Sequence, residues 1–165
     1  MRDYINIRLS YEAKFFIESI QTQLQESLQS SISEKELPLI EQSIKSFINH
    51  EFKELNPKTI DAISVTTILK VSSSSIIEGA FKYSSNFPLD KWKIIETEMN
   101  AFKIDKNIEV GSLTPKLYLE KDVIIGLNQY QKDFMKESMI RIVRLSYVIS
   151  IVVFAYYKYI FNIES

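Results

Sequence analysis

Residues 4–9 alternate between apolar and polar side chains, which is the period of two that a half-buried strand requires. One face holds Ile5, Ile7 and Leu9, and the other holds Tyr4, Asn6 and Arg8. The alternation predicts a strand over residues 3–9. From residue 11 the apolar spacing changes to three and four, which predicts an amphipathic helix over residues 11–30 with Ser10 at its N-cap.

Two further stretches have helical spacing. The first predicts a helix over residues 34–55, and Ser33 and Glu36 have the spacing of a capping box at its start. The second predicts a helix over residues 89–103. Their apolar stripes are Ile40, Ile44, Phe47, Ile48, Phe52 and Leu55 in the first helix, and Trp92, Ile95, Met99 and Phe102 in the second.

Residues 62–83 are harder to interpret. Residues 62–71 are rich in β-branched side chains, four serines follow, and residues 76–83 alternate again. We therefore predict a β-hairpin over 62–83 with Ser72–Ser75 as its loop. The alternative is a single helix, because several apolar residues of 60–71 also fit one helical face. Short extended pieces are expected at 107–110 and 116–119.

Residues 120–160 contain no helix breaker except Gly126. Helical spacing of apolar residues runs throughout, which predicts a helix or helix pair of about 40 residues, roughly 60 Å long if continuous. We expect one domain overall, with an α+β globular part at 1–119 and a long C-terminal helix at 120–165. The predicted fold class is α+β and predominantly helical, with a small antiparallel sheet packed on amphipathic helices.

Composition excludes several kinds of chemistry. The 165-residue chain has 20 Lys+Arg, 21 Asp+Glu, no Cys and one His. Disulfides, thiolate nucleophiles and cysteine-based metal sites are therefore excluded. The glycines, Gly79, Gly111 and Gly126, are too widely spaced for a phosphate-binding loop. We expect no cofactor, no metal and no enzymatic activity.

Three groups of polar residues, the third being the Ser72–Ser75 run, are candidates for reactive chemistry. His50 and Glu54 lie one helical turn apart, and the acidic residues Asp90, Glu96 and Glu98 lie in the predicted 89–103 helix. A metal needs a third ligand beside the first pair, and paired-carboxylate catalysis needs a fixed distance that the sequence does not define. We interpret both as solvated helix faces, and the serine run as a loop.

The opening YINIRLS, followed by two amphipathic helices, resembles in outline the ribbon-helix-helix repressors over residues 1–55. In that family an intertwined dimer places alternate polar residues of an N-terminal strand in the DNA major groove. The resemblance implies a nucleic-acid face made of Tyr4, Asn6 and Arg8. Residues 1–55 hold six Lys/Arg and nine Asp/Glu, so nucleic acid is the less favoured partner.

The C-terminal segment is the most distinctive. Residues 145–157 contain no charge, and Lys158 is the only charged residue within 145–163. Such a helix can be internal core, a membrane tail anchor, or an interface with a partner or a second copy. The candidate residues for an interaction or membrane helix are Leu145, Val148, Ile149, Val152, Val153, Phe154, Tyr156 and Tyr157.

From these features we expect a non-enzymatic protein-protein interaction or structural subunit that uses its apolar C-terminal helix to hold a protein partner or another copy of itself. The alternatives are a tail-anchored protein with residues 145–163 in the membrane, and a ribbon-helix-helix-like DNA-binding regulator. The first thirty residues lack the apolar run of a secretory signal. The expected location is therefore intracellular and cytoplasmic, at a membrane under the tail-anchor alternative.

Overall fold

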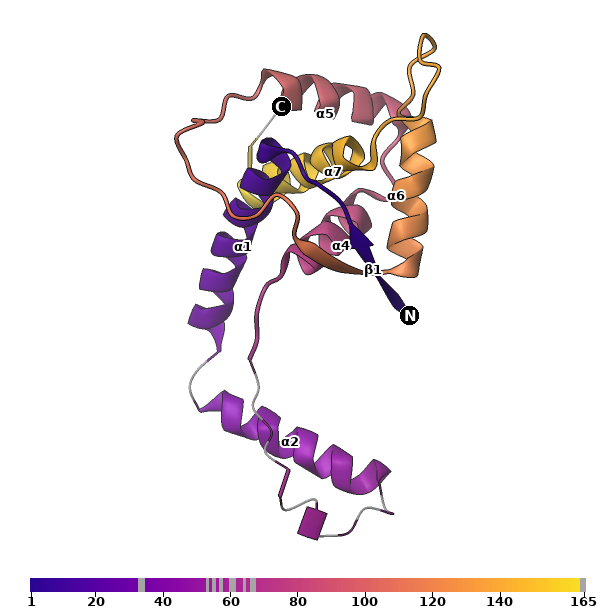
Figure 1. Cartoon of the computed structure of the whole chain (residues 1–165). Helices are drawn as coiled ribbons and strands as arrows, with labels where there is room; N and C mark the ends of the chain where they lie inside the picture. Colours follow the sequence, from indigo (N-terminus) through magenta and orange to yellow (C-terminus); the bar gives the residue numbers. More distant parts are fainter. Residues whose placement is uncertain are drawn as a thin grey trace. The chain divides into compact units, whose positions relative to one another are not determined.

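The computed structural model describes residues 1–32, 35–52, 54, 56, 58–59, 62–63, 65 and 68–163. It has an α+β fold that is predominantly helical, as the sequence predicts (Figure 1). Contacts divide the chain into a first unit, Met1–Gln23 with Val71–Ser165, and a second unit, Leu24–Lys70. The predicted division of one domain into 1–119 and 120–165 stays a prediction.

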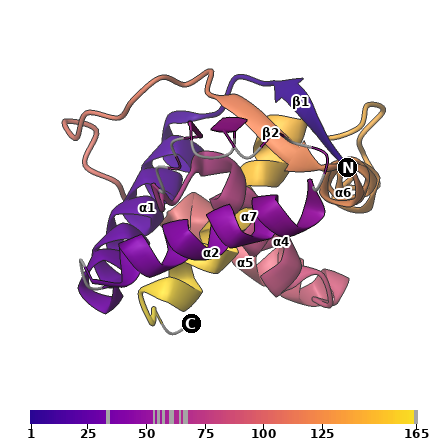
Figure 2. The same cartoon turned by 90° about the horizontal axis from the view of Figure 1, so that it is seen from below.

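The sheet joins two distant parts of the chain. Strand β1 (Arg2–Asn6) pairs antiparallel with β2 (Lys116–Glu120), so the partner of the predicted N-terminal strand is one of the predicted extended pieces. Figure 2 shows the two strands side by side. The strand predicted over 3–9 is confirmed only as far as Asn6, where β1 ends. Within β1, Ile5 pairs with the buried Leu117 and Tyr4 pairs with the exposed Tyr118.

Helix α1 (Tyr11–Ser31) confirms the predicted 11–30 helix and its cap. The Ser10 hydroxyl accepts a hydrogen bond from the backbone N–H of Ala13 at 3.0 Å, which satisfies one of the free donors at the helix start. The residues of α1 that are fully buried in the first unit recur at helical spacing: Ala13, Phe16, Ile17 and Ile20.

The predicted hairpin at 62–83 is wrong. Residues Ser73–Ser84 form helix α4, and none of the described residues of 62–72 is in a strand. Residues 60, 61, 64, 66 and 67 lie outside the described part. The serine run begins the helix, because Ser72 and Ser75 form a reciprocal capping box. Apolar positions that looked alternating then fall on one helical face, with Ile76, Ile77 and Ala80 buried.

Of the two predicted alternatives for residues 120–160, the structure has the helix pair, and a single continuous C-terminal helix is wrong. Helix α6 (Lys121–Asp133) ends before an irregular segment, and helix α7 (Leu145–Ile160) follows. Gln131 and Val143 exchange two hydrogen bonds, of 3.1 Å and 2.8 Å, that close this segment. No Pro or Gly marks the break. Tertiary packing stabilises the break, because it lets α7 fold back against α6, which a continuous helix cannot do.

Helix α7 is the centre of the first unit. Residues 148–155 are all buried, and α7 contacts α4, α6 and α5 (Leu89–Ala101), the last being the predicted 89–103 helix (Figure 1). Aromatic rings link it to α1, because Phe16 packs against Phe154 with 5.1 Å between ring centroids and against Tyr157 with 4.9 Å. A helix that is apolar all round is stable in water only when neighbours cover every side.

An ion pair attaches the sheet to α4. Glu78 is 5% exposed, and Arg2 donates to both of its carboxylate oxygens at 2.6 Å and 2.9 Å. The backbone N–H of Glu120 also donates to Glu78, at 2.8 Å. Three donors therefore compensate the desolvation of a buried carboxylate and fix the position of both strands on the helix.

In the second unit, helix α2 (Glu36–Glu51) corresponds to the predicted 34–55 helix but is shorter. The predicted capping box includes Ser33, which lies outside the described residues, as does Leu55 of the predicted stripe. Lys35 is the N-cap and makes no side-chain cap hydrogen bond. None of the residues of α2 is buried. This helix therefore contributes little to a core within the described part of its own unit.

Candidate functional site

The predicted interaction helix lies in the core. Of its eight candidate residues, five are at most 1% exposed, namely Val148, Ile149, Val152, Val153 and Phe154, while Leu145, Tyr156 and Tyr157 are half-buried. The structure therefore places this segment in the first of its three alternatives, internal core. Within the described ranges, no helix combines the length and apolar character that a membrane crossing requires.

Of the predicted nucleic-acid face, Tyr4 and Asn6 lie in β1 of the intramolecular sheet, whereas Arg8 follows the end of the strand. Tyr4, Asn6 and Arg8 are all exposed, and the Tyr4 ring packs against Tyr118 with 4.5 Å between ring centroids and 32° between ring planes. The Lys116 ammonium lies 4.8 Å from the Tyr4 ring centroid. In the ribbon-helix-helix family the strand pairs with its copy in an intertwined dimer, whereas here β1 pairs with β2 of its own chain. The strand pairing of that family is therefore not reproduced.

The acidic residues considered for catalysis are held in separate contacts. Tyr147 donates to Glu96 at 2.7 Å, with Lys136 3.6 Å away, and Lys158 donates to Glu98 at 2.5 Å. Burial, followed by the Glu96 contact, raises the pKa of Tyr147 above 10.0. Glu96 and Glu98 therefore each join α5 to α7, and the sequence pattern did not reveal these contacts.

His50 lies on the surface of α2. Its Nδ1 is 3.1 Å from a carboxylate oxygen of Glu51, and its side chain is 74% exposed. No group of three or more metal-ligating side chains is found among the described residues. His50 and Glu54 therefore find no third metal ligand in the described part of the chain.

A stripe of exposed residues runs along α2. Its members follow spacings of three, four, four and three, and we call them the α2 stripe: Glu36, Leu39, Ser43, Phe47 and His50. Leu39 is 61% exposed and Phe47 62%. Ser43 lies midway between them, and a groove of about 390 Å³ is lined by Leu39, Ile40, Ser43, Ile44 and Phe47.

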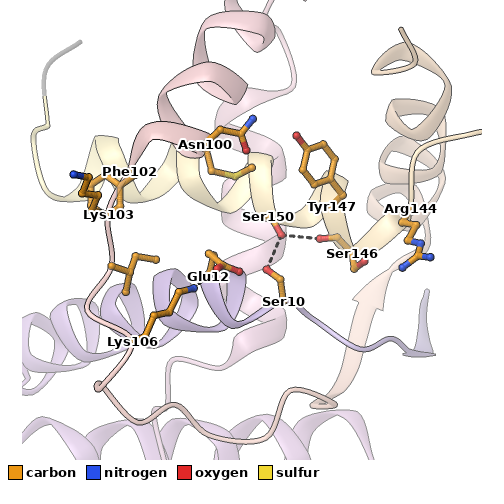
Figure 3. Close-up of a pocket in the computed structure, with 12 residues that line it drawn as sticks. Ser10, Glu12, Asn100, Phe102, Lys103, Lys106, Arg144, Ser146, Tyr147 and Ser150 are labelled. Atoms are coloured by element: carbon orange, nitrogen blue, oxygen red, sulfur yellow. Dashed lines mark hydrogen bonds and ion pairs between the residues drawn. The ribbon is translucent and has the colours of Figure 1, made fainter. Parts of the chain in front are cut away.

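A larger cavity, of about 700 Å³, lies in the first unit where α1 and α7 begin. Figure 3 shows Lys103 and Arg144 at opposite ends of its lining, with three serines between them. These serines form a chain in which Ser10 and Ser150 are 3.2 Å apart and Ser150 donates to the backbone carbonyl of Ser146 at 2.9 Å. Met99, Phe102 and Ile104 supply apolar surface.

The charged residues of this cavity are unequal in number. The lining includes three cations, Lys103, Lys106 and Arg144, and one carboxylate, Glu12. Lys106 donates a short hydrogen bond to Glu12, and this contact lowers the pKa of Glu12 below its ordinary value of 4.5. The ammonium of Lys106 also lies 4.4 Å from the centroid of the Tyr11 ring. The Glu12 charge is therefore compensated inside the cavity, and two cations remain.

Sequence reasoning missed this cavity. Its residues come from separate segments, the start of α1, the end of α5 with residues 102–106, and the start of α7. No family model, curated protein or solved structure matches this chain significantly.

Proposed function

We propose that this chain is a non-enzymatic assembly subunit that pairs with a second copy of itself through the α2 stripe. The observation that carries the proposal is a helix with an apolar face and no buried residue, whose two large stripe residues are 61% and 62% exposed. Exposed apolar surface of this kind is characteristic of interaction sites.

The pattern of the α2 stripe favours a second copy over an unrelated partner. Its spacings are symmetric about Ser43, so an antiparallel pair with its two-fold axis at Ser43 places Leu39 of one copy opposite Phe47 of the other. The same axis places Glu36 opposite His50 at both ends. A small side chain at the crossing point allows close approach of the two helices.

The size of the surface sets the expected affinity. A helix of 16 residues is about 24 Å long, so α2 alone covers much less than the roughly 800 Å² per partner of a standard interface. We therefore expect a micromolar dimer. Each Phe47, 62% exposed, would bury about 120 Å² of apolar surface, which contributes about 3 kcal/mol, or roughly 100-fold in affinity, per side chain, and a two-fold dimer buries two of them.

The experiment is sedimentation velocity of the full chain from about 1 µM to about 500 µM, for the wild type and two variants. The wild type should dimerise reversibly, and Phe47→Glu should weaken association at least about 100-fold. Asn49→Glu is the matched control, because it adds the same charge on nearly the opposite side of α2. It should dimerise like the wild type.

Circular dichroism of both variants establishes that α2 remains folded. A wild type that stays monomeric throughout would overturn the proposal. So would a dimer that Phe47→Glu leaves intact, or an equal loss in Asn49→Glu.

A further inference from the structure

We propose that the cavity between the starts of α1 and α7 binds a small organic anion, one that carries a phosphate or carboxylate group, through Lys103 and Arg144. This site lies in the first unit and is independent of pairing through α2. Nothing in the assembly role requires it, so either proposal can fail alone.

The volume fits a small molecule better than a bare ion. About 700 Å³ lies within the roughly 300–1,000 Å³ of typical ligand sites, and it far exceeds one phosphate group. Met99, Phe102 and Ile104 line part of the wall, which provides apolar contact for a carbon skeleton. Polar groups among apolar walls are the usual composition of such sites.

The charged side chains that line the cavity favour an anionic ligand. Lys106 is engaged by Glu12, whereas no carboxylate within the described part of the chain forms an ion pair with Lys103 or Arg144. Two cations at the ends of one cavity create a local positive potential in a chain whose formal net charge is −1. An arginine guanidinium also matches the fork geometry of phosphate and carboxylate oxygens.

The serine chain supplies neutral partners between the two cations. The hydroxyls of Ser10 and Ser150 lie 3.2 Å apart, and because Ser150 donates to the Ser146 carbonyl, Ser10 is the donor between them. Acceptor capacity therefore remains on both oxygens, which suits a hydroxyl group of a ligand whose charged end binds at Arg144. Because Lys106 already pairs with Glu12, this carboxylate repels an anionic ligand only weakly.

Isothermal titration calorimetry of the full chain at low salt tests the proposal with four probes. Glycerol 3-phosphate and citrate represent organic anions, inorganic phosphate represents the bare ion, and glycerol is the uncharged comparison. We expect at least one organic anion to bind with a millimolar or lower Kd, inorganic phosphate to bind more weakly, and glycerol to give no signal.

Two variants and a matched control assign the site. Arg144→Gln and Lys103→Gln should each weaken binding of the organic anion about tenfold or more. Arg141→Gln removes the same charge three residues from Arg144 but does not line the cavity, so its affinity should stay within about twofold of the wild type.

Three results would overturn the proposal: no binding of either organic anion, equal binding of glycerol, or an equal loss in Arg141→Gln and Arg144→Gln. The substituted side chains are exposed, so an unchanged melting temperature in each variant establishes that a loss of binding is local.

Discussion

Helix α6 approaches α4 at Gly126, where the ring of Phe81 lies against the α6 backbone. The substitution Gly126→Ala tests how close this approach is. A Cβ at this position would lie 2.1 Å from Cζ of Phe81 and 2.6 Å from its Cε2, far inside van der Waals contact. The ring of Phe81 also packs against Tyr130, with 5.7 Å between centroids. The ring must therefore move before alanine can be accommodated.

Two opposing effects determine the change in the free energy of unfolding. Alanine is favoured over glycine inside a helix by about 1 kcal/mol. Displacing a packed ring by more than an ångström costs about 2–3 kcal/mol, the upper part of the range for overpacked sites. We expect Gly126→Ala to destabilise the first unit by about 1–2 kcal/mol, which lowers Tm by about 2–8 °C for a chain of this size.

A double-mutant cycle with Phe81→Ala isolates the contact. Without the ring, Gly126→Ala should stabilise the protein by about 1 kcal/mol, so the coupling energy should be about 2–3 kcal/mol. Urea unfolding followed by the fluorescence of Trp92, which lies in the same unit, gives each free energy. If Gly126→Ala stabilises the protein while Phe81 is present, the close approach described here is refuted.

Three further predictions concern the same unit. Ser72→Ala removes the capping box of α4 and should cost about 1 kcal/mol in urea unfolding, and no loss would contradict the assigned helix start. Arg2→Ala leaves the buried carboxylate of Glu78 without its ion pair and should lower the free energy of unfolding by about 1–3 kcal/mol. This range is reduced for solvent screening, because the Arg2 side chain is 39% exposed. The double variant with Glu78→Gln should recover part of the loss. Burial raises the pKa values of five tyrosines above 10.0, namely Tyr83, Tyr130, Tyr147, Tyr156 and Tyr157. Their contribution to stability is therefore complete below pH 10 and declines as the pH rises above it. Urea titrations at pH 9 and at about pH 11 should show that decline, and equal stability at both would contradict it.

Local signals in the sequence were sufficient to place α1, α2, α5 and the first part of the N-terminal strand, which ends at Asn6 and not at residue 9 as predicted. The clearest case is Ser10, where a capping residue precedes a regular apolar stripe and the hydrogen bond to Ala13 is present. Each of these predictions depends on residues within one element, which is the range over which periodicity and capping chemistry act.

The failures involve contacts between distant residues. Ser72 and Ser75 can form a loop or a capping box, and only the burial of Ile76 and Ile77 against the rest of the unit favours the helix. The break between α6 and α7 likewise has no local marker, because it is stabilised by packing of the two helices on each other. The cavity at Arg144 assembles three separate segments, so its residues share no sequence pattern.

Cysteine cross-linking tests self-pairing through α2 most directly. The chain has no Cys, so Ser43→Cys introduces a single thiol at the proposed two-fold axis, where the two Cα atoms should approach within about 7 Å. Under mild oxidation Ser43→Cys should form a disulfide-linked dimer rapidly, whereas Asn49→Cys, which lies off the α2 stripe and about 120° around the helix from Ser43, should not. Equal rates for the two variants, or no cross-link at position 43, would contradict the proposed assembly.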